Sequence, residues 1–111
     1  MNTFAKVFLL TLSLAYPVHA ETQSWLTSFY KDGKITANGE PFYPNGYTCA
    51  HKTLPFNTVL LLTYNDKHAV CRVNDRGPFI KGRDLDVTLQ IAKELDFVKT
   101  GTAKIQVIIL R

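Results

Sequence analysis

The sequence has 111 residues, with 13 basic and 9 acidic side chains and a formal net charge of +4. A chain of this length holds one domain with one modest core. The basic residues are scattered rather than clustered, which argues against a nucleic-acid-binding surface. The mild positive charge favours at most an anionic partner, such as a cell-wall polymer.

The N-terminal segment has the pattern of a secretory signal peptide. Lys6 supplies a positive charge, residues 7–15 are almost purely apolar, and Pro17 ends this run just before a cleavage site of small residues. The apolar run is about half the length needed to cross a bilayer, so no stable membrane anchor is expected. We therefore predict that residues 1–20 are a cleaved signal peptide. Residues 21–111 are predicted to form the folded domain of a periplasmic or secreted protein, which we expect to be a monomer.

Strands and loops alternate through the first half of this domain. Residues 25–30 are predicted to form a strand, and the Asn-Gly pair at 38–39 a tight turn that presents Glu40. Residues 41–46 include two prolines, which lack backbone N–H groups, so this segment is predicted to be a loop. A buried strand over 47–51 is predicted to follow.

The second half of the domain contains the two clearest strands, 59–64 and 69–73, which a short turn joins. An alternating segment at 84–87 leads to Thr88, which can cap a short helix over 89–95. A last strand is predicted over 103–110. Many short strands with a single short helix indicate a small barrel rather than a layered α/β domain.

The two cysteines, Cys49 and Cys71, are most simply interpreted as one disulfide in an exported chain. Closing a loop of this length stabilises a fold by about 3 kcal/mol. The alternative is a zinc site that adds His51 and His68. The Cys-Ala-His spacing is too short for the usual structural zinc pattern, so no metal is predicted.

Few carboxylates occupy positions that suggest chemistry. Glu40 lies at the edge of a loop rich in aromatic residues, and Asp75 lies where an apolar strand ends. Each also has an ordinary structural explanation: Asp75 can cap its own backbone turn, and Glu40 can be an exposed turn charge. His51 can equally be a hydrogen-bonded core histidine, and Asp86 can favour the N-terminus of the following helix. The functional alternative is that two carboxylates flank a sugar-binding groove, since cleavage of a glycosidic bond needs a proton donor with a raised pKa.

The chain resembles the RlpA-like (rare lipoprotein A) family over about residues 27–110, in four motifs that occur in the family order. The motifs are TANGE at 36–40, TCAHKTLPF at 48–56, VNDRGPF at 73–79 and GRDLDV at 82–87. The resemblance implies a mainly β fold, a six-stranded double-psi β-barrel with one short helix. It also implies a lytic transglycosylase without a cofactor, whose partner is the glycan strand of peptidoglycan. Such an enzyme cleaves the bond between N-acetylmuramic acid and N-acetylglucosamine without water and leaves a 1,6-anhydro end.

The resemblance assigns catalytic roles to Asp75, Glu40 and His51. Asp75 would protonate the glycosidic oxygen and then accept the proton of the C6 hydroxyl group, while Glu40 would stabilise the developing positive charge or orient the sugar. His51 would hold one carboxyl group by a hydrogen bond. We therefore expect all three side chains around one sugar-sized cleft. Substrate binding is predicted for four residues nearby: Phe42, Tyr43, Arg76 and Asp86.

Two other functions stay open at this stage. The same barrel occurs in expansin-like and plant-defence proteins that bind or loosen polysaccharides without cleaving them, and an effector acting on another cell's wall is a third possibility. The motifs also depart from the family pattern: Lys31 follows the first aromatic pair where glycine is common, and Asn57 replaces a glycine in a turn. Asparagine is the residue that best tolerates the left-handed conformation which such a turn requires.

Overall fold

The computed structural model describes residues 21–110, so the predicted signal peptide lies outside the described residues. Six strands and one helix follow in chain order: β1 (Gln23–Tyr30), β2 (Thr48–His51), β3 (Val59–Tyr64), β4 (Lys67–Asp75), β5 (Leu85–Thr88), α2 (Leu89–Leu95) and β6 (Thr102–Ile109). The predicted fold class, a small six-stranded β-barrel with one short helix, is confirmed. In residues 21–110 no helix combines the length and the apolar character that crossing a membrane requires.

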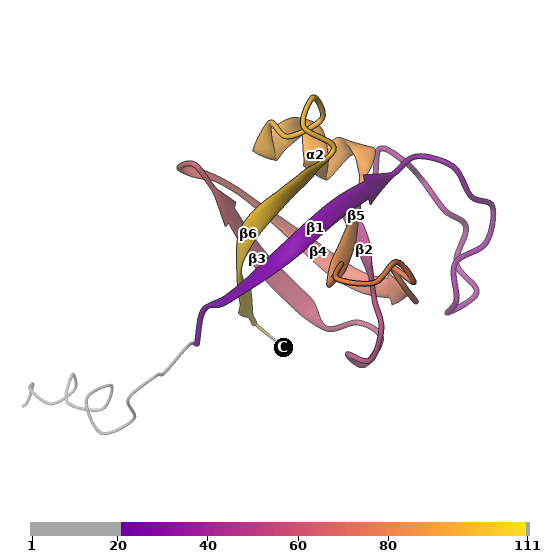
Figure 1. The fold of residues 1–111 in the computed structure, drawn as a ribbon. Coiled ribbons are helices and arrows are strands. Elements are labelled where there is room, and N and C mark those ends of the chain that lie inside the picture. The colour runs from indigo at the N-terminus through magenta and orange to yellow at the C-terminus, as the bar shows by residue number, and fades with distance from the viewer. Residues whose placement is uncertain (1–20, 111) are drawn as a thin grey trace, which may run out of the picture.

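The strands close into a barrel in the order β1-β5-β2-β4-β3-β6 (Figure 1). The pairs β1–β5 and β2–β4 run parallel, and the other neighbours run antiparallel. Strands far apart in the sequence therefore lie side by side, and closure leaves no free sheet edge. The order brings the ends of β2, β4 and β5 together.

The core follows from alternation along the strands, which directs every second side chain into the barrel. The buried apolar side chains include Leu60, Leu62, Cys71, Val73, Leu85, Val87, Ile105 and Val107. The helix α2 lies at the top of the barrel in Figure 1. Its first turn is capped as predicted, because the Thr88 side chain accepts a hydrogen bond from the backbone N–H of Ile91.

β4 is longer than the predicted 69–73 at both ends. Asn65 and Asp66 both adopt positive φ angles, of 48° and 68°, which gives a tight two-residue turn and lets Lys67 pair with Tyr64 at once. At the other end the ladder continues past a bulge to Asp75, which pairs with Ala50 of β2. The predicted turn residue Asp75 is therefore the last residue of a strand.

The disulfide between Cys49 and Cys71 is confirmed and joins β2 to β4, with 5.8 Å between the two Cα atoms. Both residues are buried in the core. Within residues 21–110, no three His, Cys, Asp or Glu side chains gather closely enough to hold a metal ion. The backbone of Asn57 has a φ angle of 75°, which agrees with the expectation that asparagine replaces glycine there in a left-handed turn.

Candidate active site

Two aspartates and an alanine form a row across three adjacent strands. Ala50 of β2 is in register with Asp86 of β5 on one side and with Asp75 of β4 on the other. Residues in register on neighbouring strands direct their side chains to the same face of a sheet. The backbones of the two aspartates are thus two strand spacings apart, roughly 10 Å. The methyl group between them leaves space above the sheet that a larger side chain would fill.

A pocket of about 370 Å³ lies over this row. Both aspartates and Ala50 line it, together with Tyr30 from β1 and with Arg76 and Phe79 from the loop after β4. Its volume falls in the range typical of small-molecule sites. The barrel order therefore builds a cavity with two acids from segments that are distant in sequence.

Asp75 is held by three hydrogen bonds. Its Oδ1 atom accepts from the backbone N–H groups of Ala37 and Arg76, both at 2.9 Å, and its Oδ2 atom accepts from the Tyr30 hydroxyl at 3.0 Å. Burial and the adjacent Asp75 charge raise the pKa of Tyr30 above its ordinary value of 10, so the hydroxyl keeps its proton and donates it. These contacts fix the orientation of the Asp75 carboxylate toward the pocket.

Asp86 is less tightly held. Its Oδ1 atom accepts a hydrogen bond from the Ser28 hydroxyl at 3.0 Å. Burial raises the pKa of Asp86 above its ordinary value of 3.8, and the negative charge of Asp75 adds to this effect, whereas Ser28 and Arg83 oppose it. Burial is thus the main reason that the pKa of Asp86 lies above its ordinary value.

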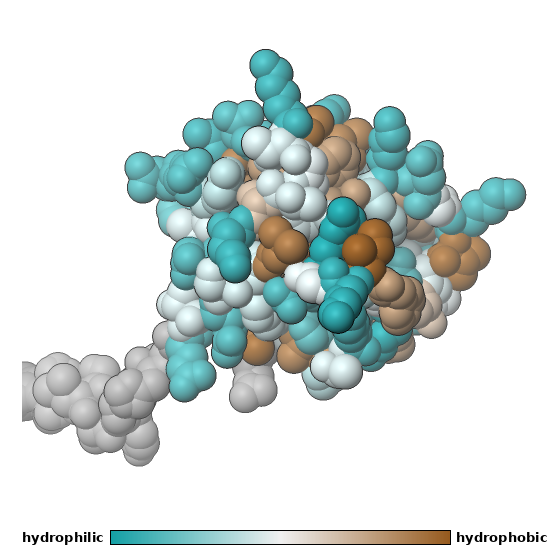
Figure 2. Space-filling view, in the orientation of Figure 1, coloured by the Kyte–Doolittle hydropathy of each residue, from teal (hydrophilic) through white to brown (hydrophobic). Residues whose placement is uncertain are grey.

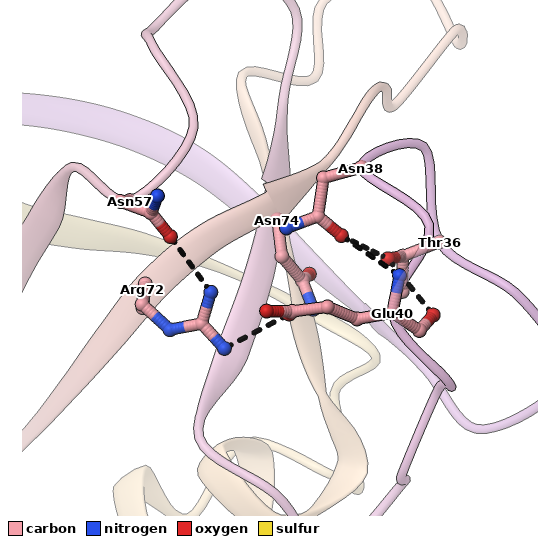
Figure 3. A network of polar contacts seen from close by, with 6 residues as sticks. All are labelled: Thr36, Asn38, Glu40, Asn57, Arg72 and Asn74. Atoms are coloured by element: carbon pink, nitrogen blue, oxygen red, sulfur yellow. Dashed lines mark hydrogen bonds and ion pairs between the residues drawn. The ribbon is translucent and has the colours of Figure 1, made fainter.

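Glu40 does not lie in this pocket, so the expectation that residues 40 and 75 share one cleft is wrong. The Glu40 carboxylate accepts hydrogen bonds from Arg72 Nη2 and Asn74 Nδ2, each at 2.9 Å (Figure 3). Arg72 and Asn74 point to one face of β4 and Asp75 to the other, because successive strand residues alternate. The bond from Arg72, with that from Asn74, lowers the pKa of Glu40 from 4.5 to about 2. Glu40 is consequently an ion-paired carboxylate that lines a neighbouring hollow.

The turn at 36–40 nevertheless connects Glu40 to Asp75. Asn38 Oδ1 accepts hydrogen bonds from the Thr36 hydroxyl at 2.7 Å and from the Glu40 backbone N–H at 3.1 Å (Figure 3). The Asn38 backbone N–H donates to the Asn74 carbonyl oxygen at 3.2 Å. The same turn carries the Ala37 N–H group that binds Asp75. The TANGE motif therefore attaches to β4 through Glu40 and Asn38 and supports Asp75 through its backbone.

His51 does not hold a carboxyl group, contrary to the prediction. Within residues 21–110, its Nδ1 atom accepts hydrogen bonds from the backbone N–H groups of Thr53 and Leu54, at 3.1 and 3.0 Å. Its ring lies against Trp25, with 4.9 Å between the ring centroids. Burial lowers the pKa of His51, and the charges of Lys52 and Arg76 act in the same direction. The neutral ring is therefore favoured, and it stabilises the turn after β2.

Two aromatic residues predicted to bind sugar differ in exposure. Phe42 is only 8% exposed and stacks on Tyr30, with 4.6 Å between ring centroids and 21° between ring planes. It lines the pocket from behind Tyr30 and exposes little of its ring, and substrate binding by Phe42 stays a prediction. Tyr43 is exposed but lines the hollow of Glu40 rather than the aspartate pocket.

Arg76 reaches the pocket as predicted, but other contacts hold its guanidinium group. That group lies 4.0 Å from the centre of the Phe56 ring, and its Nη1 atom donates to the His51 carbonyl oxygen at 3.2 Å. The sequence reasoning overlooked Ser28, Tyr30 and Phe79. Ser28 and Tyr30 share one face of β1 by strand alternation, and this pattern could have indicated their common direction.

Comparison with solved structures shows the fold. The Streptomyces papain inhibitor superposes with a TM-score of 0.65 over 86% of this chain and 98% of that protein, at 20% sequence identity. At this identity the similarity establishes the barrel architecture alone. Together with the strand order, it defines the chain as a small double-psi β-barrel protein.

Sequence comparison identifies the family. Residues 22–107 match the family described as lytic transglycolase, and the chain therefore belongs to this family. Similar relatives include the endolytic peptidoglycan transglycosylase RlpA of Campylobacter jejuni, 42% identical over 78% of this chain and 33% of that protein. The RlpA of Pseudomonas aeruginosa UCBPP-PA14 is 45% identical over 78% of this chain and 26% of that protein. The chain thus corresponds to about a third or less of the length of these relatives.

Proposed function

We propose that this protein is a lytic transglycosylase of peptidoglycan that cleaves the bond between N-acetylmuramic acid and N-acetylglucosamine and forms 1,6-anhydro ends. Family membership and the names of the relatives support this class of reaction. The observation that carries the proposal is the row Asp86–Ala50–Asp75 on the floor of an open pocket. Two carboxyl groups on either side of a sugar-sized space are what glycosidic bond cleavage through an oxocarbenium-like transition state requires.

The proposed reaction divides the proton transfers between the two aspartates. Asp86 donates a proton to the glycosidic oxygen as the bond from C1 of the muramic residue breaks, and its position in the pocket and the upward direction of its pKa support this role. Asp75 stabilises the positive charge at C1 and accepts the proton of the C6 hydroxyl group as its oxygen bonds to C1. The product is an anhydro ring and a free sugar hydroxyl group, with no water consumed. Exchange with solvent then removes the proton from Asp75 and returns one to Asp86, which completes the cycle.

Glu40 and His51 act in this proposal as positioning residues. Glu40 anchors the 36–40 turn to β4, and this turn supplies the Ala37 N–H group to Asp75. His51 fixes the turn after β2 and offers its carbonyl oxygen to Arg76, whose backbone N–H also binds Asp75. Tyr30 is a further positioning residue through its hydroxyl group. Each therefore affects the rate through the orientation of Asp75.

The disulfide indicates folding in an oxidising compartment outside the cytoplasm. We propose that the site of action is the periplasm or the cell exterior, and that the protein works as a monomer on glycan strands.

Digestion of purified sacculi tests the proposed reaction. The wild-type protein should release muropeptides with 1,6-anhydro ends, detected by mass spectrometry, and Asp75→Asn should release fewer by a factor of about 100 or more. The variant keeps the shape of the side chain and should retain the wild-type circular dichroism spectrum. Reducing ends instead of anhydro ends would indicate a hydrolase. Binding to sacculi without any new ends would favour the second candidate, an expansin-like polysaccharide-binding module on the same barrel.

A further inference from the structure

Three large apolar side chains are exposed around the mouth of the aspartate pocket. Phe79 is 82% exposed, Ile35 68% and Ile80 54%, and all three line the pocket. In Figure 2 brown side chains lie among teal ones over the loop that leads into β5. Side chains this exposed add little to the stability of the fold, and an apolar patch rimmed by polar groups marks an interaction site.

The Phe79 ring lies against the backbone of its own loop. A Cβ atom at Gly77 would lie 3.5 Å from the ring, and the φ angle of Gly77, +125°, is one that glycine adopts readily. At this distance a Cβ atom would make an ordinary van der Waals contact with the ring, so the φ angle rather than the space is what favours glycine there. With most of its surface exposed, the ring presents a flat apolar area at the edge of the pocket.

We propose that Phe79, flanked by Ile35 and Ile80, binds the apolar C–H face of a saccharide ring next to the scissile bond. The inference rests on the proposed function for its ligand, the glycan strand. A pyranose ring has polar edges and an apolar face, which suits the pocket because carboxylates lie on its floor and apolar side chains on its rim. We call these three side chains the saccharide wall. Its exposed Phe79 ring, rather than the buried Phe42 ring, is the aromatic surface on which a sugar can stack.

Binding measured without turnover tests whether the saccharide wall contacts the glycan. In an Asp75→Asn background, we would measure the dissociation constant for purified sacculi and for the same sacculi stripped of stem peptides by an amidase. Phe79→Ala should weaken binding to both by about 10-fold, since it removes the apolar area that binding would bury. Phe79→Trp should bind at least as tightly as the Asp75→Asn parent. Val70→Ala is the matched control, because Val70 is an exposed apolar residue of β4 that lines a different surface.

The outcomes separate this inference from the proposed function. Unchanged binding by Phe79→Ala, or an equal loss in Val70→Ala, would contradict the proposed role of Phe79 in saccharide binding. A loss seen only with intact stem peptides would assign Phe79 to peptide rather than saccharide and would also overturn it. Full binding by Phe79→Leu would exclude a requirement for the ring face. If the wild-type protein made no anhydro ends while Phe79→Ala lost binding to stripped glycan, the proposed reaction would fail and the saccharide wall would stand.

Discussion

The acids on the two faces at the end of β4 have different surroundings. On one face, Asp75 and the half-buried Asp86 share a pocket, and burial raises the pKa of Asp86. On the other face, Glu40 is bonded to Arg72 and Asn74, and its pKa falls to about 2. A group that is ionised at every physiological pH and already paired is a poor proton donor. In the proposed reaction, Glu40 of the TANGE motif therefore supports the site from the opposite face of β4, and Asp86 in the pocket donates the proton.

The largest loss of activity is expected for Asp86→Asn. The amide can still accept the hydrogen bond from Ser28 but has no acidic proton, so the rate of anhydro-end formation should fall about 100-fold or more. Initial rates on purified sacculi measure this effect. Asp66→Asn serves as the control, since Asp66 is exposed in the β3–β4 turn and asparagine tolerates its positive φ angle. Near-normal activity in Asp86→Asn would return both proton transfers to Asp75.

Substitutions of Glu40 should lower the rate less than Asp86→Asn does. Glu40→Gln retains an acceptor for Asn74 and Arg72, so the turn should stay attached and the rate should fall no more than roughly threefold. Glu40→Ala leaves the buried Asn74 amide without its partner, and loosening of the turn should lower the rate about 10-fold through misplacement of Asp75. If Glu40 instead stabilised charge in the transition state, both variants would lose activity to the same extent.

The difference in stability between the wild-type protein and Glu40→Gln should decrease as the pH falls. The pKa of Glu40 is lower in the folded protein than its ordinary value of 4.5. The pair with Arg72 therefore contributes fully to the stability of the fold above about pH 5. That contribution is lost as the pH falls through about 2, where the carboxylate is protonated. The Tm difference between wild type and Glu40→Gln should therefore shrink on acidification. A constant difference from pH 7 to pH 2 would contradict the ion pair.

The sequence contains much of the fold but less of the site. An apolar run between turn residues predicts β3, and the Thr88 cap predicts α2, because both signals are local. A turn after β3 is predicted correctly, but β4 begins earlier and ends later than predicted, since Lys67 pairs with Tyr64 and pairing with β2 extends the strand to Asp75. The pattern of short strands indicates a small barrel, but its six-stranded double-psi form came from family resemblance, because parallel neighbours such as β2 and β4 leave no local pattern.

Within the site, the direction of each side chain depends on contacts that sequence spacing does not contain. Asp75 and Asp86 were both identified, but their separation by Ala50 follows from the order of three strands. Glu40 turns away because Arg72 and Asn74 bind it. Phe42 is buried because it stacks on Tyr30, and a loop aromatic gives no sign of this in sequence. Local rules thus identify candidates, whereas tertiary contacts decide which of them face the pocket.

The smallest expected effect concerns the coupling between the two pocket acids. Burial is the main cause of the raised pKa of Asp86, and the charge of Asp75 is an additional one. Carbon-13 NMR titration of the Asp86 carboxyl carbon should show a pKa above 3.8 in the wild-type protein. In Asp75→Asn the pKa should fall but stay above that value, because the charge is removed and the burial remains. A pKa that does not move would mean that the charge of Asp75 does not act on Asp86, and burial alone would then account for the raised pKa of Asp86.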